Sequence, residues 1–438
     1  MPPVNRAIDN APTETPTVAG AQGPLSPAQS KAIIDRLEAQ EKGSDLLERH
    51  LAIERALAGA PLIAGNRTRL LENGPPTFSA IFKTIRAAKR YVFLEYYIFE
   101  NVTSDNERLG DLLLAKRNEG VEIAIIYDGY GSVDTPSAFF DRLKAAGVKV
   151  VEFHPLNPLK AQNGYSINDR DHRKILVADG VTAIVGGVNL YTVYQSHPHA
   201  GLVASQGPSP ETWHDTDVEI AGPAAQQLQQ IFLDHWLAEG GTPLPPIANA
   251  PPHAVGDDVV RIIGSDHNDT IPRYNATLLS AIRSADKTVW LTTAYFVPTE
   301  DEKHDLEAAA RRGVDVRLML PGKSDSALAL AAGHAAYDDL LEAGVKIFEM
   351  RDGVLHSKCA VVDGVWSTVG SSNFDHRSIL FNDEVDAVIL GHGTAQQLAA
   401  QFEKDEASAR QITLAAWEDR SLMERIRELY SRVVQDLL

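Results

Sequence analysis

One short pattern of residues occurs twice in this chain of 438 residues, with the same internal spacing each time. It consists of His-x-Lys, an Asp after four further residues, and then, after six more, Gly, a small residue, any residue and Asn. A single His-x-Lys would carry little information, but so many fixed positions repeated in register predict two halves of one active site. The two copies contain His172, Lys174, Asp179, Gly187 and Asn189, and His356, Lys358, Asp363, Ser371 and Asn373.

The repeated residue types suit the cleavage of a phosphodiester. One histidine can attack the phosphorus as a nucleophile while the other acts from the opposite side as an acid. Two lysines and two asparagines can hold the non-bridging oxygens and stabilise the charge that grows in the transition state. We expect neither a metal nor another cofactor, because His-x-Lys places an ammonium group where a second zinc ligand would have to be.

Each copy also predicts a hairpin. An apolar run follows the lysine, and Asp179-Gly180 and Asp363-Gly364 are strong turn signals. A returning strand brings the asparagine back beside the histidine. We expect the turn aspartates to bind backbone rather than substrate. The glycines either let backbone approach a phosphate oxygen or simply end a strand.

A histidine that attacks phosphorus usually needs a carboxylate to hold its other ring nitrogen. Each half of the chain offers a candidate after its hairpin, Asp215 in the first half and Glu384 in the second. Asp217 lies on the same strand face as Asp215, so the choice between these two remains open.

The surroundings of the two copies predict an α/β fold in which two domains are related by a pseudo-twofold axis. Strand patterns alternate with helix patterns in the same order on both sides, which indicates mixed, largely parallel sheets flanked by helices. The predicted segments are a disordered segment at 1–25, a helical extension at 26–60, a first domain at 61–242, a Pro-rich linker at 243–256, a second domain at 257–400 and a C-terminal helical segment at 401–438.

Composition and charge narrow the class of protein. Acidic residues outnumber basic ones by 59 to 41, so nucleic acid is not an expected partner and an anionic substrate needs a local basic pocket. No apolar run approaches the length that spans a bilayer. We expect a cytoplasmic protein, with peripheral contact at the inner face of the cell membrane as the form of any membrane association. Candidates for that contact are Trp213, the 191–194 stretch and the polar 155–168 loop.

The two copies and their flanks resemble the phospholipase D superfamily, and within it the bacterial cardiolipin synthases. The flanks that carry this resemblance are Leu94-Glu95-Tyr96-Tyr97-Ile98-Phe99, Tyr127-Asp128-Gly129-Tyr130-Gly131-Ser132, Ala294-Tyr295-Phe296-Val297-Pro298, Leu320-Pro321-Gly322-Lys323-Ser324-Asp325 and the segment from Gly370 to Ser378 with Asn382 and Glu384. The resemblance implies that His172 is the nucleophile and His356 the acid and later the base. Members of the superfamily differ in which copy attacks, so these two roles can be exchanged.

The resemblance implies a phospholipid substrate, with phosphatidylglycerol the expected one, and no obligate protein partner. In the first hypothesis a phosphatidyl group passes through phosphohistidine to the hydroxyl of a second lipid, giving cardiolipin and glycerol. In the second hypothesis water is the acceptor and the product is phosphatidic acid; the sequence does not separate the two. A nuclease fits the acidic composition poorly, and a scaffold with an idle pocket would predict a damaged motif, whereas both copies are intact.

Overall fold

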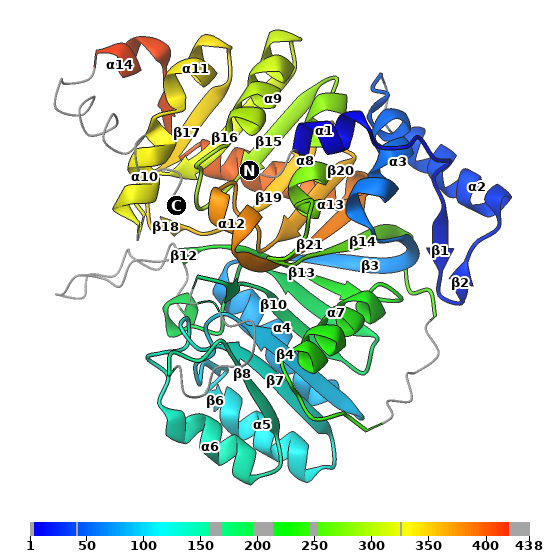
Figure 1. The fold of residues 1–438 in the computed structure, drawn as a ribbon, viewed down its shortest axis with the longest axis vertical. Coiled ribbons are helices and arrows are strands. Elements are labelled where there is room, and N and C mark those ends of the chain that lie inside the picture. The colour runs from blue at the N-terminus through cyan, green and yellow to red at the C-terminus, as the bar shows by residue number, and fades with distance from the viewer. Residues whose placement is uncertain are drawn as a thin grey trace.

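The computed structural model describes residues 4–40, 43–157, 166, 168–195, 213–245, 253–324 and 326–419. These residues form two α/β halves, the first below and the second above in Figure 1, with the strands that carry the repeated motif near the boundary between them. The α/β class and the internal repeat predicted from the sequence are confirmed.

In the first half, strands β4, β7 and β8 are parallel and are joined by helices, as the alternation of patterns predicts. The motif hairpin, β10 with β11, adds antiparallel strands to β4, and β13 and β3 continue the sheet. The elements are β3 (Leu62–Glu72), α4 (Gly74–Ala87), β4 (Tyr91–Tyr96), β5 (Thr103–Ser104), β6 (Glu107–Arg108), α5 (Leu109–Asn118), β7 (Glu122–Asp128), α6 (Ser137–Ala145), β8 (Lys149–Phe153), β9 (Arg170–Asp171), β10 (Lys174–Ala178), β11 (Thr182–Gly186), the 3-10 turn η2 (Thr192–Gln195), β12 (Trp213–His214), β13 (Thr216–Ala221) and α7 (Ala225–Ala238).

The second half repeats this order. Strands β15, β16 and β17 are parallel, and the hairpin of β19 and β20 adds the antiparallel part. The elements are β14 (Asp258–Ser265), α8 (Arg273–Ser284), β15 (Thr288–Thr292), α9 (Glu300–Arg311), β16 (Asp315–Pro321), α10 (Ala327–His334), α11 (Tyr337–Glu342), β17 (Lys346–Met350), β18 (Val354–Leu355), β19 (Cys359–Val362), β20 (Trp366–Gly370), α12 (His376–Leu380), β21 (Asn382–Leu390), α13 (His392–Glu406), β22 (Arg410–Ile412) and α14 (Leu414–Glu418).

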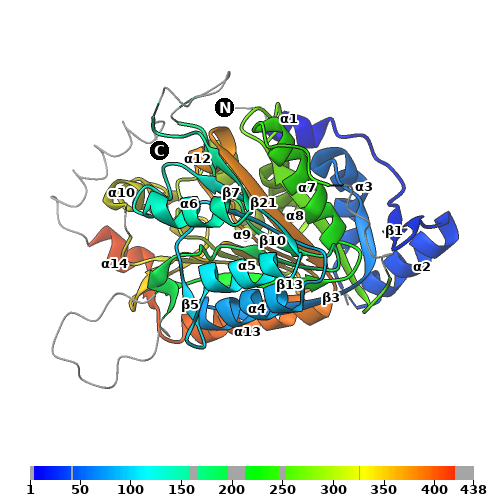
Figure 2. The ribbon, with the colours of Figure 1, turned by 90° about the horizontal axis from the view of Figure 1, so that it is seen from below.

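The two halves share one core. Strand β3 pairs with β14 of the second half as well as with β13 of the first, so the sheet continues from one half into the other. Apolar side chains of both hairpins pack together at this boundary, among them Val177 and Val185 with Val361 and Val369. Figure 2 shows α4 and α13 along one side of the joined sheet. This shared packing fixes the position of one motif relative to the other.

The prediction of a disordered segment at 1–25 is wrong for its described part. Residues Val4–Asp9 form α1, and Val18–Gly20 (β1) and Gly23–Pro24 (β2) pair with each other. Val4 and Ile8 are buried, and β1 also pairs with β3 through Val18 and Leu62. A segment without periodicity is therefore ordered by tertiary contacts.

The helical extension begins as the sequence indicates. Ser26 caps α2 (Pro27–Glu38) with Pro27 at the first helical position, and Gln29 completes a capping box. Helix α3 (Leu46–Ala58) then packs on the second half, where His50 Nδ1 lies 2.9 Å from the hydroxyl of Ser280.

Two predicted boundaries differ from the structure at the C-terminal side. Helix α13 crosses residue 400, and β22, which was expected to be helical, pairs antiparallel with β17. The second sheet therefore extends beyond the predicted domain end, because Ile412 is buried next to Ile347. Much of the predicted linker and of the 155–168 loop, and residues 420–438, lie outside the described residues.

Candidate active site

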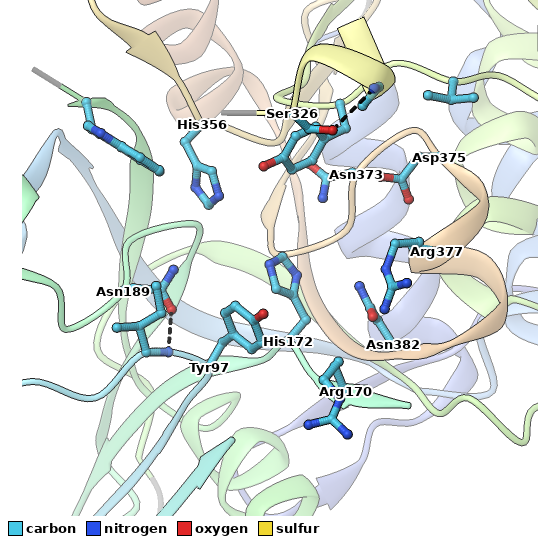
Figure 3. A pocket seen from close by; sticks show the side chains of 15 residues that line it. Tyr97, Arg170, His172, Asn189, Ser326, His356, Asn373, Asp375, Arg377 and Asn382 are labelled. Carbon is cyan, nitrogen blue, oxygen red and sulfur yellow. Dashed lines mark hydrogen bonds between the residues drawn. The ribbon is translucent and has the colours of Figure 1, made fainter. Parts of the chain in front are cut away.

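The two repeated histidines face each other across one pocket. Their ring centroids are 6.5 Å apart, and both rings line a cavity of about 290 Å³ (Figure 3). Asn189 and Asn373 line the same cavity. The central expectation from the sequence, that two half-sites meet at one centre, thus agrees with the geometry.

The hairpins place each motif lysine next to the backbone of its histidine. Lys174 and Lys358 are each 1% exposed, and each ammonium group donates to the backbone carbonyl of the histidine two residues before it. Asn189 Oδ1 accepts a hydrogen bond from the backbone of Ile98, which orients its amide at the pocket. Each half therefore supplies one histidine, one lysine and one asparagine to the same small volume.

Each histidine is held by a carboxylate from the opposite half. His172 Nδ1 lies 3.0 and 3.1 Å from the two carboxylate oxygens of Glu384, and His356 Nδ1 lies 2.7 Å from Asp215 Oδ2. Short ladders hold these crossed pairs: β9 runs parallel to β21, and β12 runs parallel to β18. With Nδ1–H directed at a carboxylate, Nε2 is the ring nitrogen that can reach a phosphorus.

The geometry also separates Asp215 from Asp217. Asp217 Oδ1 accepts from the backbone N–H of Val188 and so fixes the end of the first hairpin. In the second half Asp386 occupies the corresponding position and accepts from the hydroxyl of Ser372. Asp215 contacts the histidine, whereas Asp217 supports the backbone beside it.

A hydroxyl five residues after each motif asparagine orients the carboxylate. Tyr194 donates to Asp215 Oδ2 over 2.8 Å, and Ser378 donates to Glu384 Oε1 over 2.9 Å. Sequence reasoning missed both residues, although aligning the two copies places them at equivalent positions. Asn382 adds a further hydrogen bond, from Nδ2 to Glu384 Oε1 over 3.1 Å.

Burial dominates the electrostatics of the site. Burial, together with the two nearby lysines, lowers the pKa of His172 well below its usual value, and burial and Lys358 lower that of His356. In the free protein, burial therefore favours the neutral form of both rings. Burial lowers the pKa of Lys174 to about 7 and raises that of Glu384 to about 7. An anionic substrate would favour the charged form of the lysine.

The motif aspartates lie at the turn, away from the pocket. The carboxylate of Asp179 accepts from the backbone N–H groups of Lys89, Arg90 and Tyr91, just before β4. Asp363 accepts in the same way from residues 286–288, just before β15. Both contacts join the hairpin turn to the start of a parallel strand, and neither aspartate lines the pocket.

The difference between Gly187 and Ser371 has a steric reason. A Cβ at Gly187 would lie 2.1 Å from Asp215 Oδ1, which leaves no room for a side chain. At the corresponding place in the second half, the Ser371 hydroxyl accepts from the backbone N–H of Val385 over 2.9 Å. The first copy thus requires glycine because its partner carboxylate approaches closely.

Aromatic and charged residues that the sequence had not assigned to the site complete the pocket. The ring of Tyr97 lies 5.3 Å from that of His172, and the ring of Trp213 lies 5.2 Å from that of His356. Arg170 and Arg377 also line the cavity. Trp213, which the sequence offers as a candidate for membrane contact, is half-buried and its ring lies beside that of His356.

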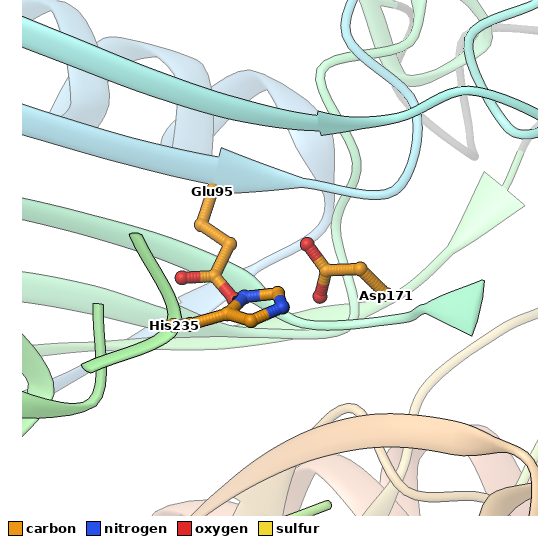
Figure 4. A group of neighbouring side chains, drawn as sticks. All are labelled: Glu95, Asp171 and His235. Atoms are coloured by element: carbon orange, nitrogen blue, oxygen red, sulfur yellow. The ribbon is translucent and has the colours of Figure 1, made fainter. Parts of the chain in front are cut away.

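A buried ionic cluster lies beside the pocket. Glu95, Asp171 and His235 approach one another closely enough to resemble a set of metal ligands (Figure 4). The guanidinium of Arg173 lies 3.4 Å from Glu95, and His235 Nδ1 lies 2.9 Å from the same oxygen. Burial opposes the charge of His235, but Glu95 raises its pKa to about 9. Two side-chain cations therefore already balance these carboxylates, and the cluster anchors the segment that carries His172.

Comparison with known proteins finds one family model and several relatives that match most of the chain. Residues 81–236 and 278–406 match the family described as "Cardiolipin synthase, PLD-like domain". The chain is 35% identical to the cardiolipin synthase of Geobacillus kaustophilus, over 86% of this chain and 74% of that protein. It is 34% identical to cardiolipin synthase A of Pseudomonas aeruginosa, over 86% of this chain and 73% of that protein.

Among solved structures, the phosphatidylserine synthase of Haemophilus influenzae is similar in fold. Its TM-score is 0.64 at 14% sequence identity, and the match covers 88% of this chain and 99% of that one. At that level of identity the likeness concerns the fold, including the arrangement of two similar halves.

Proposed function

Because the chain belongs to the cardiolipin synthase family with phospholipase D-like domains, we propose that it transfers a phosphatidyl group from one phosphatidylglycerol to the hydroxyl of another. The products are cardiolipin and glycerol. One observation carries the proposal: two histidines face each other at 6.5 Å across one pocket, and each is oriented by a carboxylate from the opposite half.

In the first step Nε2 of His172 attacks the phosphorus of the donor lipid. The bond between phosphorus and the glycerol oxygen breaks, and His356, which is protonated on Nε2 when the anionic substrate is bound and whose positive charge Asp215 stabilises, supplies the proton that glycerol takes away. The phosphatidyl group is then bound to His172. Glu384 stabilises the positive charge that develops on this ring, because it accepts the Nδ1–H hydrogen bond.

In the second step His356 removes a proton from the hydroxyl of the acceptor lipid. The resulting oxygen attacks the phosphorus, and the bond between phosphorus and His172 breaks. Lys174 and Lys358, with Asn189 and Asn373, stabilise the negative charge on the non-bridging oxygens in both steps. Every group that this cycle requires belongs to the chain itself.

Water is the competing acceptor in this mechanism. If water attacks the phosphohistidine, the product is phosphatidic acid and the protein acts as a phospholipase D. Identity of about a third to several cardiolipin synthases over most of the chain favours the transferase.

The pocket has an apolar rim suited to peripheral membrane contact. Tyr130 and Leu328 are among the exposed large hydrophobic residues. The ring of Tyr130 lies 6.0 Å from the guanidinium of the pocket residue Arg170, and Leu328 neighbours the pocket residue Ala329. Among the described residues no helix is long and apolar enough to cross a bilayer. We propose that this rim rests on the lipid surface from which substrate enters, at the inner face of the cell membrane.

The decisive test incubates the purified protein with labelled phosphatidylglycerol in vesicles and separates cardiolipin from phosphatidic acid. Cardiolipin is the expected main product, and phosphatidic acid without cardiolipin would favour the hydrolase. His172→Ala should remove both products, whereas His304→Ala, a control at an exposed histidine of α9, should keep full turnover. Full turnover of His172→Ala would refute the mechanism.

Trapping the intermediate tests which histidine is the nucleophile and which is the acid. Rapid acid-free quenching of the wild-type protein followed by peptide mapping should find the labelled phosphatidyl group on His172. A label on His356 would exchange the two roles without changing the reaction.

A further inference from the structure

The two walls of the pocket are equivalent in backbone but opposite in chemistry. On one side β9 pairs with β21, and Arg170 lies opposite Asn382. On the other side β12 pairs with β18, and Trp213 lies opposite Val354. The two pairs occupy equivalent positions in the two halves, because Arg170 and Val354 each precede the motif histidine by two residues.

A third position shows the same difference. Arg377 follows Asn373 by four residues, and Val193 follows Asn189 by four residues. Arg377 lines the pocket beside Arg170 and Asn382 (Figure 3). We call Arg170, Arg377 and Asn382 the cationic wall. The equivalent positions of the other half, Val354, Val193 and Trp213, of which Trp213 lines the pocket, we call the apolar wall.

The cationic wall is built into the fold. Arg170 is 4% exposed, and its guanidinium is held by Asp128 at 3.4 Å and by the backbone carbonyl of His154 at 3.3 Å. Its Nε is buried and has no hydrogen-bond partner among the described residues. Arg377 is half-buried and donates to the backbone carbonyl of Asn168 over 3.1 Å. Arg170 Nη2 also donates to the backbone carbonyl of Ser166 over 3.3 Å, so Arg170 keeps its second Nη2 hydrogen for a ligand, and Arg377 keeps most of its donors.

Two carboxylates lie near this wall, and both are also hydrogen-bonded to backbone N–H groups. Asp128 faces Arg170 but also accepts the backbone N–H groups of Tyr130, Gly131 and Asp171. Asp375 lines the pocket, but its carboxylate accepts the backbone N–H of Ser378 over 2.8 Å. Two guanidinium groups with partly occupied donors form an anion site distinct from the lysines at the reacting phosphorus.

We propose that Arg170 and Arg377 bind the phosphate of the acceptor lipid, an inference that rests on the proposed transferase function. The reaction brings two phosphates into one pocket. Lys174 and Lys358 serve the phosphate that reacts, and the second phosphate requires cations of its own. Among the described residues that line the cavity, Arg170 and Arg377 are the permanently charged ones. The apolar wall offers no such group, so the acceptor has one favoured orientation.

The test compares three acceptors on the same labelled phosphatidylglycerol donor. Phosphatidylglycerol is an anionic lipid acceptor, glycerol 3-phosphate is a soluble acceptor with a phosphate, and glycerol is a neutral acceptor whose transfer is read as headgroup exchange. All three reactions share donor cleavage and the phosphohistidine, so they differ only in recognition of the acceptor.

The chosen variant is Arg377→Gln, because Arg377 is half-buried and its loss disturbs the fold less than loss of Arg170. We expect transfer to both phosphate-bearing acceptors to fall about tenfold or more, while exchange with glycerol stays near the wild-type rate. Arg377→Lys should recover part of the loss. Arg311→Gln, which removes the same charge from α9 outside the pocket, is the matched control and should behave as wild type.

Several outcomes would overturn the inference. An equal loss with all three acceptors would place Arg377 at the donor phosphate or in the fold, and no loss with any acceptor would exclude an acceptor site. A loss confined to phosphatidylglycerol would indicate contact with the lipid surface instead of the phosphate. If the wild-type protein exchanges glycerol but makes no cardiolipin, the proposed function fails, independently of any variant.

Discussion

Replacement of the turn aspartate tests whether the third repeated position of the motif acts in folding or in chemistry. Asp179 accepts three backbone hydrogen bonds of 2.8, 2.8 and 3.0 Å, and its φ of 54° places it in the left-handed region. Hydrogen bonds to a charged group contribute about 1.5 kcal/mol or more each, and partial exposure reduces that value. We therefore expect Asp179→Ala to lower the free energy of unfolding by about 2–4 kcal/mol.

The conservative variant refines this expectation. Asp179→Asn retains one acceptor oxygen and the tolerance of asparagine for the left-handed region, so the loss should be about 1–2 kcal/mol. Asp363, which binds residues 286–288 and the hydroxyl of Ser44, provides the matching pair of variants in the second half.

The assay combines urea unfolding, followed by tryptophan fluorescence, with initial rates of cardiolipin formation at low temperature, where the variants remain folded. The midpoint of unfolding should shift to lower urea, whereas kcat of the folded protein should change by less than about twofold. An unchanged midpoint together with a large loss of kcat would refute the reasoning, because the aspartate would then act on the substrate.

Three further predictions concern the carboxylates that orient the histidines. Glu384 has a pKa of about 7 and is an ionised hydrogen-bond acceptor for His172 only above that pH, whereas Lys174, whose pKa in the free protein is also about 7, is charged only below it. We therefore expect a bell-shaped dependence of kcat/KM on pH with its maximum near pH 7. Glu384→Gln should flatten the acidic limb of this profile and lower its maximum. Tyr194→Phe removes the hydroxyl that donates to Asp215, so kcat should fall about tenfold with little change in KM, measured from initial rates on vesicles; an unchanged kcat would contradict the orienting role. Gly187→Ser should displace Asp215 and lower kcat at least about tenfold despite serine at the equivalent place in the second copy, and a fully active variant would show that the site relaxes.

Much of the fold and the centre of the site follows from local signals. The Asp-Gly turns, the alternation of strands and helices, and the fixed distance from histidine to asparagine each depend on residues close in sequence. Such signals act within one half, and they predict the histidines and asparagines that line the shared pocket.

The remaining features depend on how the halves dock. Nothing near His172 in sequence indicates that its carboxylate partner is Glu384, because that contact joins residues 212 positions apart. The order of residues 4–25 likewise depends on burial of Val4, Ile8 and Val18 against distant elements. Arg377 carries no local signal either; only alignment with Val193 in the other half reveals the asymmetry.

Each histidine takes its carboxylate from the opposite half, so activity requires that the two halves are docked. If the halves separated by even a few ångströms, both imidazoles would lose their orienting carboxylates together. Such a molecule would be inactive rather than a weak or unselective hydrolase. A molecule whose halves have come apart would therefore not be expected to hydrolyse phospholipids.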